Sequence, residues 1–582
     1  MTTAQNGLRL WPGVLIVTLT WLIRFGLPVL VPEALPYAVG GGLLGGLIVL
    51  GWWAFFSRAQ GLERWGALAI IVAGLGVTSQ FLHASITKGM MGMMFWIYAI
   101  PVASLGLVIW AVASRGFSAG LRRATMVVSM VLACGGWTMV RTNGMTGEAV
   151  SDFTWRWTPT AEERLLARPM EPVALVAKVV PEEPTVVPTV PVPAVVKPLA
   201  SWAGFRGPNR DGALRGVSIE TDWGAKPPVE MWRQPVGPGW SSLAVEGDRL
   251  YTQEQRGAEE AVSCYRVGTG KLVWRHVDAA RFWESNAGAG PRGTPTLHNG
   301  RVYTFGATGI LNALDAGDGA VKWSRDVPKD SEAKVPGWGF SSSPLVVDDL
   351  VIVAGGGRLV GYNLVTGEPR WLGPKGGSGY SSPHLVTIAG VRQIVLMSGP
   401  GATSLAVKDG ARLWEHALPA NARITQPALT AEGDLLLSDG EGNNLHRVAV
   451  SQGASGWTTE ERWSSNGLKP YFSDFVIHKG HAYGFDGSIL ACLDLNDGKR
   501  KWKGGRYGHG QMILLADQDL LLVLTEEGEL ALVSAVAEGF AEKARFRAIE
   551  GKTWNHPVLV GDVLLVRNSE EMAAFRLATP RR

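Results

Sequence analysis

Thr269-Gly270-Lys271-Leu272-Val273-Trp274 places a tight turn four residues before a tryptophan, and this pattern recurs through the second half of the chain. Successive tryptophans of the series stand 42, 49, 48, 43, 49 and 39 residues apart. A period of about 45 residues is the length of one four-stranded propeller blade, so the pattern predicts a β-propeller. The series consists of Trp232, Trp274, Trp323, Trp371, Trp414, Trp463 and Trp502, of which Trp232 and Trp463 follow degenerate turns.

Each period also opens with a second phrase that reads Ser-Ser-Pro or Thr-Pro, as in Ser342-Ser343-Pro344 and Ser381-Ser382-Pro383. An apolar run, a polar turn and further runs then follow. Short runs separated by tight turns are typical of the strands of one twisted blade. In the second period, the pattern predicts strands over residues 295–297, 301–305, 311–315 and 320–324.

Eight such openings occur, and the eighth blade lacks an outer strand. It runs from Pro557 to Leu577 and carries no tryptophan of the series. The run Val229 to Pro235 precedes the first blade and has no inner strands of its own. We therefore expect this early strand to pair with the eighth blade, because that pairing closes the ring and removes an exposed edge.

The lead-in from Trp202 to Gly212, Trp-Ala-Gly-Phe-Arg-Gly-Pro-Asn-Arg-Asp-Gly, and the repeat together resemble the bacterial PQQ-like β-propeller repeat proteins. This superfamily holds quinoprotein alcohol dehydrogenases and BamB-type assembly factors. WD40 propellers are the alternative, but here the tryptophan follows the glycine, and the Gly-His and Trp-Asp pairs are missing. The resemblance implies an all-β, eight-bladed propeller over residues 201–582, and it says little about chemistry because propellers serve unrelated tasks.

Residues 1–145 predict a helical membrane domain. Five apolar runs are each close to the ~20 residues that a helix needs to cross a bilayer. A cleavable signal peptide is the competing interpretation of the first run, but the runs behind it and the absence of a clear small-residue cleavage site disfavour it. The runs cover about residues 10–31, 35–56, 65–83, 93–113 and 124–140.

The loops between these runs predict the orientation, because Lys and Arg are retained on the cytoplasmic side. Arg58 and Arg64 lie between the second and third runs, while the alternate loops hold only Glu33 or Lys88. Arg115, Arg122 and Arg123 lie between the fourth and fifth. We expect a multi-pass protein of the bacterial inner membrane with a cytoplasmic amino terminus and a periplasmic propeller.

Residues 146–200 predict a periplasmic connector. Thr160 and Glu163 have the spacing of a capping box for a short helix that reaches Ala167. From Pro169 to Pro198, eight prolines alternate with valines and acidic residues, a composition that favours extended polyproline II. We expect a semi-rigid stalk that lets the propeller work away from its anchor.

The resemblance also implies one specific chemistry, a bound pyrroloquinoline quinone with calcium that oxidises an alcohol or a sugar. Many alcohol-oxidising members stack the quinone on a disulfide between adjacent cysteines, whereas Cys134, Cys264 and Cys492 are far apart. The last two stand six residues before their turn glycines, so we expect buried free thiols at equivalent places in two blades. Membrane glucose dehydrogenases of the family also lack that cysteine pair and carry about five spans, but their propeller regions are longer.

The sequence predicts no metal site. Asp315 and Asp494 recur four residues before a turn glycine, which indicates turn stabilisation. Asp494-Leu495-Asn496-Asp497-Gly498 faintly resembles a calcium loop. The aspartates are misplaced for an EF-hand, however, and no glutamate follows at position twelve.

The residues just before the inner strands vary from blade to blade and are expected to face the central channel. A lining of aromatic, basic and amide side chains suits a ligand or an extended peptide. The alternative is that these side chains only fill the funnel. In blade order they are Trp240, Arg292, Phe340, Tyr380, Arg423, Phe472, His509 and Asn555.

The net charge of +4 is small for 582 residues, and the scattered basic residues give no case for nucleic-acid binding. The main hypothesis is a non-catalytic, membrane-anchored binding or assembly platform whose partner, a protein or a small molecule, binds at the propeller face. A quinone-dependent dehydrogenase that reduces membrane quinone is the alternative, and a sensor is a third hypothesis. Arg24 lies inside the first apolar run, where a charge indicates a functional site unless it snorkels to the interface.

Overall fold

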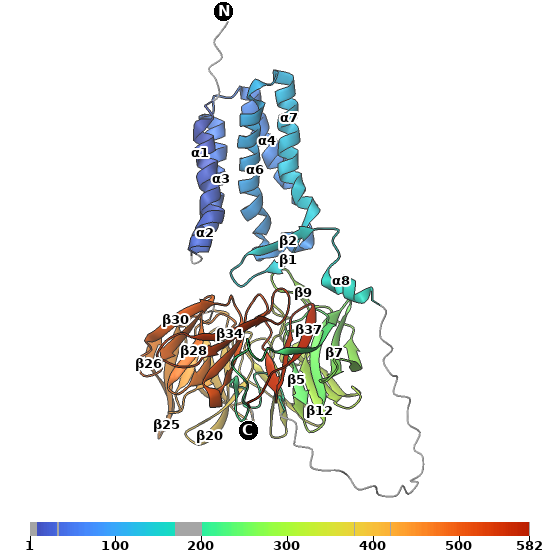
Figure 1. Cartoon of the computed structure of the whole chain (residues 1–582), viewed down its shortest axis with the longest axis vertical. Coiled ribbons are helices and arrows are strands. Elements are labelled where there is room, and N and C mark those ends of the chain that lie inside the picture. The colour runs from blue at the N-terminus through green and yellow to red at the C-terminus, as the bar shows by residue number, and fades with distance from the viewer. Residues whose placement is uncertain are drawn as a thin grey trace, which may run out of the picture. The chain divides into compact units, whose positions relative to one another are not determined.

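The computed structural model describes residues 9–31, 34–168, 201–377, 379–419, 421–440 and 442–580 (Figure 1). The chain divides into two compact units. The first comprises Met1–Pro159 with Glu284–Gly288, and the second comprises Thr160–Trp283 with Ala289–Arg582. The proline-rich stretch 169–198, predicted to be a stalk, lies outside the described residues.

The first unit is built on long apolar helices that run side by side (Figure 1). Short helical turns, α5 Ala84–Thr87, η3 Gly89–Gly92 and η4 Ser114–Gly116, connect them. The chain then forms a hairpin of β1 Val140–Met145 and β2 Ser151–Trp155. The long helices are α1 Trp11–Trp21 continued by the π-helical turn η1 Leu22–Gly26 and α2 Leu27–Leu30, α3 Leu35–Phe55, α4 Gly61–Thr78, α6 Met94–Ala113 and α7 Ala119–Gly135.

Four of these segments are long and apolar enough to cross a membrane: 11–30, 37–55, 61–78 and 94–116. The fifth predicted span differs from the observed helix in length and in position. Its helix α7 has only 17 residues and begins at Ala119, five residues before the predicted span of residues 124–140. It then passes into the 3₁₀ turn η5 Gly136–Met139, and Val140 already belongs to β1. The prediction of about five spans thus holds as an approximate count.

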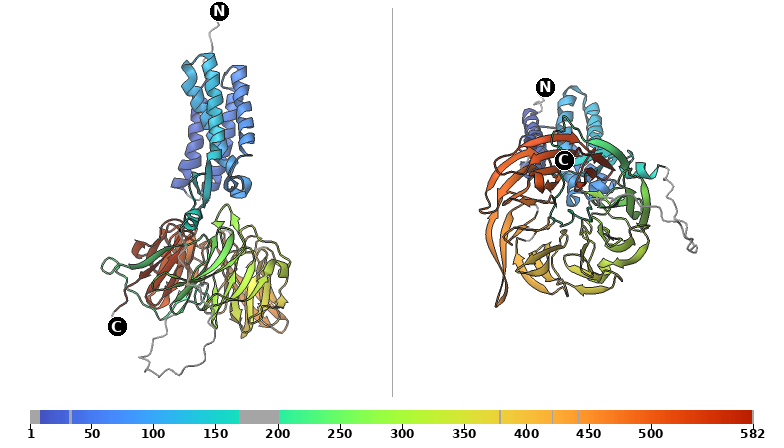
Figure 2. Two further views of the ribbon diagram at one scale, coloured as in Figure 1. Left: turned by 90° about the vertical axis from the view of Figure 1, so that its right-hand side faces the viewer. Right: turned by 60° about the horizontal axis from the view of Figure 1, so that its bottom comes forward.

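The second unit opens with α8 Ala161–Leu166. The predicted capping box is confirmed, because Thr160 Oγ1 accepts from the Glu163 N–H at 3.0 Å and Glu163 Oε2 accepts from the Thr160 N–H at 2.6 Å. From residue 201 on, the described part of the unit is an eight-bladed propeller with its lead-in, and the right-hand view of Figure 2 looks toward its ring. The predicted fold class is confirmed.

Seven blades are antiparallel sheets of strands consecutive in the chain. Four short elements lie in the loops between the blade strands: β9 Trp283–Glu284, β10 Gly288–Ala289, α9 Val327–Ser331 and η6 Ala516–Gln518. From the first blade to the seventh, the strands are β5 Ala244–Glu246, β6 Arg249–Arg256, β7 Glu259–Arg266 and β8 Leu272–Asp278; β11 Thr296–His298, β12 Arg301–Phe305, β13 Ile310–Asp315 and β14 Val321–Asp326; β15 Leu345–Val347, β16 Leu350–Ala354, β17 Leu359–Asn363 and β18 Pro369–Leu372; β19 His384–Ile388, β20 Val391–Ser398, β21 Gly401–Ala406 and β22 Arg412–Ala417; β23 Ala428–Leu429, β24 Leu435–Ser438, β25 Leu445–Gly453 and β26 Gly456–Ser465; β27 Val476–His478, β28 His481–Asp486, β29 Ile489–Asp494 and β30 Arg500–Arg506; β31 Gln511–Leu515, β32 Leu520–Leu524, β33 Glu529–Ser534 and β34 Glu542–Arg547.

The eighth blade closes the ring as predicted. It consists of β35 Val558–Val560, β36 Val563–Arg567 and β37 Glu571–Arg576, and its outer strand is β4 Val229–Pro235. β4 pairs antiparallel with β37 from Pro235 opposite Glu571 to Val229 opposite Arg576. Another early strand, β3 Ala213–Leu214, adds to the inner edge of the seventh blade in parallel with β31. Two separate early segments, β3 and β4, therefore pair with the seventh and eighth blades and help to close the ring.

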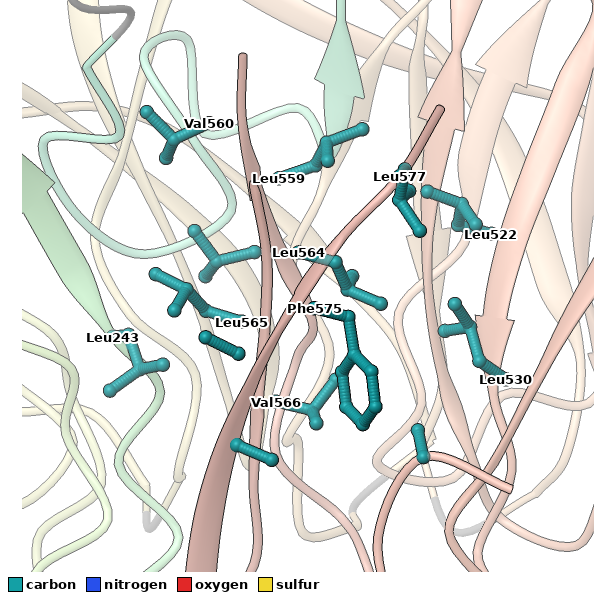
Figure 3. Packing of buried hydrophobic residues seen from close by; sticks show 14 of the residues in the cluster. Leu243, Leu522, Leu530, Leu559, Val560, Leu564, Leu565, Val566, Phe575 and Leu577 are labelled. Atoms are coloured by element: carbon teal, nitrogen blue, oxygen red, sulfur yellow. The ribbon is translucent and has the colours of Figure 1, made fainter. Parts of the chain in front are cut away.

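The core of the eighth blade is shared with its neighbours, as Figure 3 shows. Leu564, Val566 and Phe575 of β36 and β37 lie in one buried cluster with Leu522 of the seventh blade and Leu243, which precedes the first blade. All five side chains are buried. Burial of each such side chain contributes roughly 1.5–3 kcal/mol to folding, so ring closure is held by apolar packing as well as by backbone hydrogen bonds.

The repeated glycine and tryptophan form the contact between neighbouring blades. Gly319 has φ +76°, and a Cβ added there would lie 2.5 Å from the ring of Trp274 in the preceding blade. The Trp274 indole N–H donates to the Ala316 carbonyl of the same turn at 3.1 Å. The same pairing joins Gly270 to Trp232, Gly367 to Trp323, Gly410 to Trp371 and Gly498 to Trp463. Each repeat of the glycine and tryptophan pattern in the sequence therefore corresponds to one contact between neighbouring blades.

The predictions for the cysteines and turn aspartates are also confirmed. Cys264 and Cys492 are buried free thiols, and each stands opposite its blade tryptophan, Trp274 or Trp502, in the strand register. Burial raises the pKa of the Cys264 thiol to about 12. Asp315 Oδ1 accepts from the Gly317 N–H at 2.8 Å, and Asp494 Oδ1 accepts from the Asn496 N–H at 2.9 Å, so both carboxylates stabilise turns.

Candidate functional site

A relay of hydrogen bonds passes around the propeller axis through the opening phrases. The Ser242 N–H donates to Thr294 Oγ1 at 3.0 Å, and the Thr294 N–H donates to Ser343 Oγ at 2.9 Å in the next blade. The Ser242 hydroxyl donates to the His556 carbonyl at 2.7 Å and so joins the first blade to the eighth. The acceptors between Ser343 and the seventh blade are the side chains of Ser382, Gln426, Asp474 and Gln511. The opening serines thus have a structural role.

One member of this relay is charged and meets the lead-in segment. Asp474 Oδ2 lies 3.6 Å from Arg206 Nε and 3.4 Å from His556 Nε2, and all three side chains are buried. Burial alone would raise the pKa of Asp474, but the Arg206 guanidinium and the His556 hydrogen bond hold it below its usual value. Arg206 Nη2 also donates to the Phe475 carbonyl at 2.6 Å. Arg206 therefore attaches the lead-in segment to the relay by an ion pair and a hydrogen bond. The sequence alone did not predict this structural role for the lead-in.

Three of the predicted lining residues lie in one aromatic cluster. The rings of Phe472 and His509 stack with their centroids 5.3 Å apart and their planes inclined by 30°. Trp554 joins Trp240 to the cluster, because its ring centroid lies 4.7 Å from that of Trp240 and 4.8 Å from that of Phe472. Tyr471 completes the cluster at 5.2 Å from Phe472. The first, sixth, seventh and eighth blades thus contribute one continuous aromatic surface, and Trp240, Phe472, Trp554 and Tyr471 are only half-buried.

Two charged side chains flank this cluster. Lys552 Nζ lies 4.4 Å from the centroid of Trp554 and 5.3 Å from that of Trp240, within the range of a cation–π interaction. The buried Glu526 accepts from the Trp554 indole N–H at 2.8 Å and from the His509 backbone N–H at 3.0 Å. The carboxylate therefore fixes the orientation of Trp554, while the ammonium group adds positive charge to the aromatic surface.

The other predicted residues have different surroundings. Phe340 is only 2% exposed and packs 5.2 Å from Phe305 in the core. Arg423 is buried and donates to the carbonyls of Asp439 and Pro419. Asn555 is buried and donates to the Ser241 carbonyl at 2.7 Å. The ring of Tyr380 packs against that of Trp338, with the two centroids 4.9 Å apart.

Arg292 lies beside an unusual carboxylate. Its guanidinium carbon is 4.6 Å from the centroid of Phe282. Glu260 accepts from the Ala307 N–H at 3.1 Å and from Thr308 Oγ1 at 3.4 Å, and its side chain is 5% exposed. Burial raises the pKa of Glu260 to about 7, against the opposing effects of the Ala307 N–H and Arg292. Glu260 can therefore exchange a proton near neutral pH.

The relay shows which signal would have found Trp554. Trp240 stands two residues before Ser242, and Arg292, Tyr380, Phe472 and His509 stand two residues before their own relay members. Trp554 stands two residues before His556. Asn555 is one residue too late, and Phe340 and Arg423 are each one too early. An alignment on the opening phrase, rather than on the start of the inner strand, would have selected Trp554. Lys552 and Glu526 do not stand at this position of the repeat, so the same alignment would not have selected them.

The donor set around the cluster does not fit the quinone and calcium that the resemblance implies. Among the residues that the structure describes, no group of three or more His, Cys, Asp or Glu side chains could hold a metal ion. Glu526 is the carboxylate in contact with the cluster, and its oxygens already accept from Trp554 and His509. A calcium ion prefers six to eight oxygen ligands, which this arrangement does not offer.

Comparisons with known proteins agree on the type of propeller. The family model described as "Outer membrane protein assembly factor BamB" matches residues 258–504. BamB of Yersinia pestis is 25% identical over 323 residues, which cover 53% of this chain and 70% of that protein. BamB of Shewanella oneidensis is 24% identical over 368 residues, which cover 58% of this chain and 86% of that protein. The predicted resemblance to the PQQ-like propeller proteins is confirmed.

Solved structures resemble the chain in fold alone. The crystal structure of BamB from Moraxella catarrhalis has 13% identity and a TM-score of 0.44, covering 61% of this chain and 99% of that one. A quinohemoprotein alcohol dehydrogenase from Pseudomonas putida HK5 has 12% identity and a TM-score of 0.47, covering 66% of this chain and 81% of that one.

Proposed function

We propose that this protein is a non-catalytic binding platform, anchored in the bacterial inner membrane with its amino terminus in the cytoplasm and its PQQ-like, BamB-like propeller in the periplasm. The observation that carries the proposal is the half-buried aromatic cluster of Trp240, Tyr471, Phe472 and Trp554, with Lys552 beside it. Aromatic residues that keep accessible surface are the usual anchors of protein–protein contacts. The similarity to proteins named as outer membrane protein assembly factors supports a polypeptide partner.

The cluster suits an extended peptide with aromatic side chains. The strands of outer-membrane barrels alternate apolar with polar residues and carry aromatic residues near both ends. Aromatic pairs prefer offset or edge-to-face contacts, and such contacts add about 0.5–1.5 kcal/mol to the burial of their area. Lys552 would favour a peptide with acidic or carbonyl-rich flanks, whereas the cluster alone would not discriminate among aromatic sequences.

The test is a titration of the full-length protein in detergent with a synthetic peptide that alternates Phe or Tyr with polar residues. The control peptide replaces each aromatic residue with Ala. We expect binding to depend on the aromatic residues and to weaken about tenfold or more in Trp554→Ala, as for a hot-spot residue. Val365→Ala, at an exposed position in the third blade, is the matched control variant. Equal binding of both peptides, or no change in Trp554→Ala, would overturn the proposal.

The dehydrogenase alternative is tested on the same sample. Purified protein is incubated with pyrroloquinoline quinone and calcium, and dye reduction is measured with alcohols, aldoses and aldehydes. Substrate-dependent turnover that is lost in His509→Ala would replace the platform by an enzyme whose site includes the aromatic cluster. We expect no turnover, because the cluster lacks the oxygen ligands that calcium needs.

A further inference from the structure

Arg24 is a buried cation in the first membrane span. Its side chain lies in the π-helical turn η1 and is only 5% exposed. The guanidinium carbon lies 4.9 Å from the centroid of Phe25 and 5.0 Å from that of Tyr98 on α6. The charge is therefore held between two aromatic rings rather than extended freely into lipid.

The neighbouring helix is shaped to admit this side chain. A Cβ added to Gly42 of α3 would lie 2.9 Å from Arg24 Cδ, and one added to Gly41 would lie 2.7 Å from Ile23 Cγ2. The π-helical turn inserts an extra residue into the helix at the same level, a distortion that is frequent at functional sites. Both features position Arg24 toward the interior of the helical unit, and a surface arginine would need neither.

The aromatic rings do not satisfy the guanidinium, which carries five N–H donors. Within the part of the chain that the structure describes, Arg24 makes no side-chain hydrogen bond and no ion pair, and its Nε is buried without an acceptor. The one carboxylate within a candidate span, Glu63, already pairs with Arg122 at 3.2 Å. A buried cation without an acceptor is costly in a bilayer, so an acceptor from outside these residues is expected.

The position of Arg24 along its helix indicates which acceptor can reach it. Leu30 ends α2 six residues further on, a distance of about 9 Å along a helix. An arginine side chain near a span end can draw a lipid phosphate toward itself, and guanidinium and phosphate match in a bidentate pair. We propose that Arg24 binds the phosphate diester of a phospholipid at this end of the helical unit. The guanidinium is positioned for this phosphate by Phe25, Tyr98 and the surface of Gly42.

The experiment uses the full chain in detergent, with retained lipid counted by native mass spectrometry. Short-chain phosphatidylglycerol and phosphatidylcholine carry the phosphate diester, diacylglycerol lacks it, and inorganic phosphate supplies the anion without the chains. We expect both phospholipids to bind, diacylglycerol to bind much more weakly, and inorganic phosphate not to compete at equal concentration. Arg24→Gln should weaken phospholipid binding about tenfold or more, as expected for loss of a charge-assisted hydrogen bond.

Matched variants separate this site from general lipid contact. Arg9→Gln removes another arginine of the same unit, which lies beside Trp11, and should leave phospholipid binding unchanged. Arg24→Lys keeps the charge without the planar fork and should bind with intermediate affinity. Equal binding by wild type and Arg24→Gln would overturn the proposal, as would Arg24-dependent binding of inorganic phosphate alone or of a short-chain quinone in place of phospholipid.

Discussion

At the scale of single residues, the turn glycines carry the contact between blades, and Gly319→Ala tests this. Alanine at φ +76° costs about 1 kcal/mol, and its Cβ would collide with Trp274, which adds roughly 1–3 kcal/mol. The control is Gly300→Ala, where φ is +71° and nothing lies within 4 Å of the added carbon. We expect thermal denaturation, followed by near-UV circular dichroism, to show a clearly larger loss for Gly319→Ala. Equal losses would mean that the glycine serves only the turn.

Glu254 is a buried carboxylate whose ionised form stabilises the first blade. Arg256 and Arg275 lie 3.1 Å and 3.4 Å from Oε1, and Ser263 donates to the same oxygen at 2.6 Å. Burial would raise its pKa, but the two arginines outweigh burial and lower the pKa to about 2. A depressed pKa gives stability that is present above the unfolded value of 4.5 and is lost as pH falls toward 2.

Glu254→Gln should therefore destabilise the propeller by about 3 kcal/mol at neutral pH, because it leaves two partly buried guanidinium groups, 16% and 14% exposed, without their anion. Chemical denaturation at pH 7 measures this loss. The difference between wild type and variant should shrink as pH falls below 4.5, since the wild-type carboxylate then loses its advantage. A difference that stays constant down to pH 3 would show that packing, and not charge, is responsible.

Glu260 is expected to behave in the opposite way. Its pKa is raised to about 7 in the folded state, so the folded protein holds a proton that the unfolded chain releases from pH 4.5 upward. Stability is therefore lost as pH rises from about 4.5 to about 7. Glu260→Gln should remove this loss and stabilise the protein by about 1–3 kcal/mol at pH 8, with little effect at pH 4. A pH-independent effect in denaturation experiments would contradict the assignment.

At the scale of elements, β4 is the strand that completes the eighth blade. Deletion of Val229–Pro235 would expose the backbone donors and acceptors of β37 along its whole length. It would also remove Trp232, which packs on Gly270 and donates to the Val267 carbonyl at 2.7 Å. We expect the shortened protein to aggregate or to melt far below the intact chain. The control replaces the exposed Val229 with Thr, and an unchanged melting temperature on deletion would refute closure by β4.

The elements that could be predicted are those with local signals. Arg301–Phe305 forms β12 as expected because a short apolar run lies between two turns, and β4 was predicted because a strand without a blade needs a partner. The end of α7 was predicted too late, because the apolar run continues through Trp137 and Met139 although the helix has already given way to a 3₁₀ turn. Apolar content alone does not distinguish these conformations.

The candidate site was harder to predict than the fold. Trp240, Phe472 and His509, which lie in the cluster, were selected because they vary at one place in the repeat. Phe340 and Arg423 stand one residue before the corresponding position relative to the relay. Lys552 and Glu526 reach the cluster from loops of two different blades, so only the closed ring brings them to Trp554. The role of Asp474 likewise depends on Arg206, a residue more than two hundred positions away.

At the scale of the whole molecule, the helical unit places two arginine-bearing loops, 56–60 and 114–118, at one end together with the helix starts that follow them. Glu63 at the start of α4 pairs with Arg122 at the start of α7. The Trp53 indole N–H donates to the Arg64 carbonyl at 3.1 Å, and the Trp110 indole N–H donates to the Arg122 carbonyl at 3.2 Å. The two arginine-bearing loops are therefore neighbours at one end of the helices. If positive charge is retained in the cytoplasm, this end faces inward.

This arrangement makes orientation the last prediction. Residues 140–160 follow the opposite end of α7, so the stretch 169–198 and everything after it should be periplasmic. Protease added to intact spheroplasts should cut within 169–198 and release a folded fragment of about 40 kDa, given 384 of 582 residues in a chain of 62.4 kDa. Replacing Arg58, Arg64, Arg115 and Arg123 with Gln should weaken the bias and leave part of the population uncut, because these charges set the topology. Protection of the wild-type stretch until the membrane is broken would reverse the orientation and, with it, the periplasmic location of the aromatic cluster.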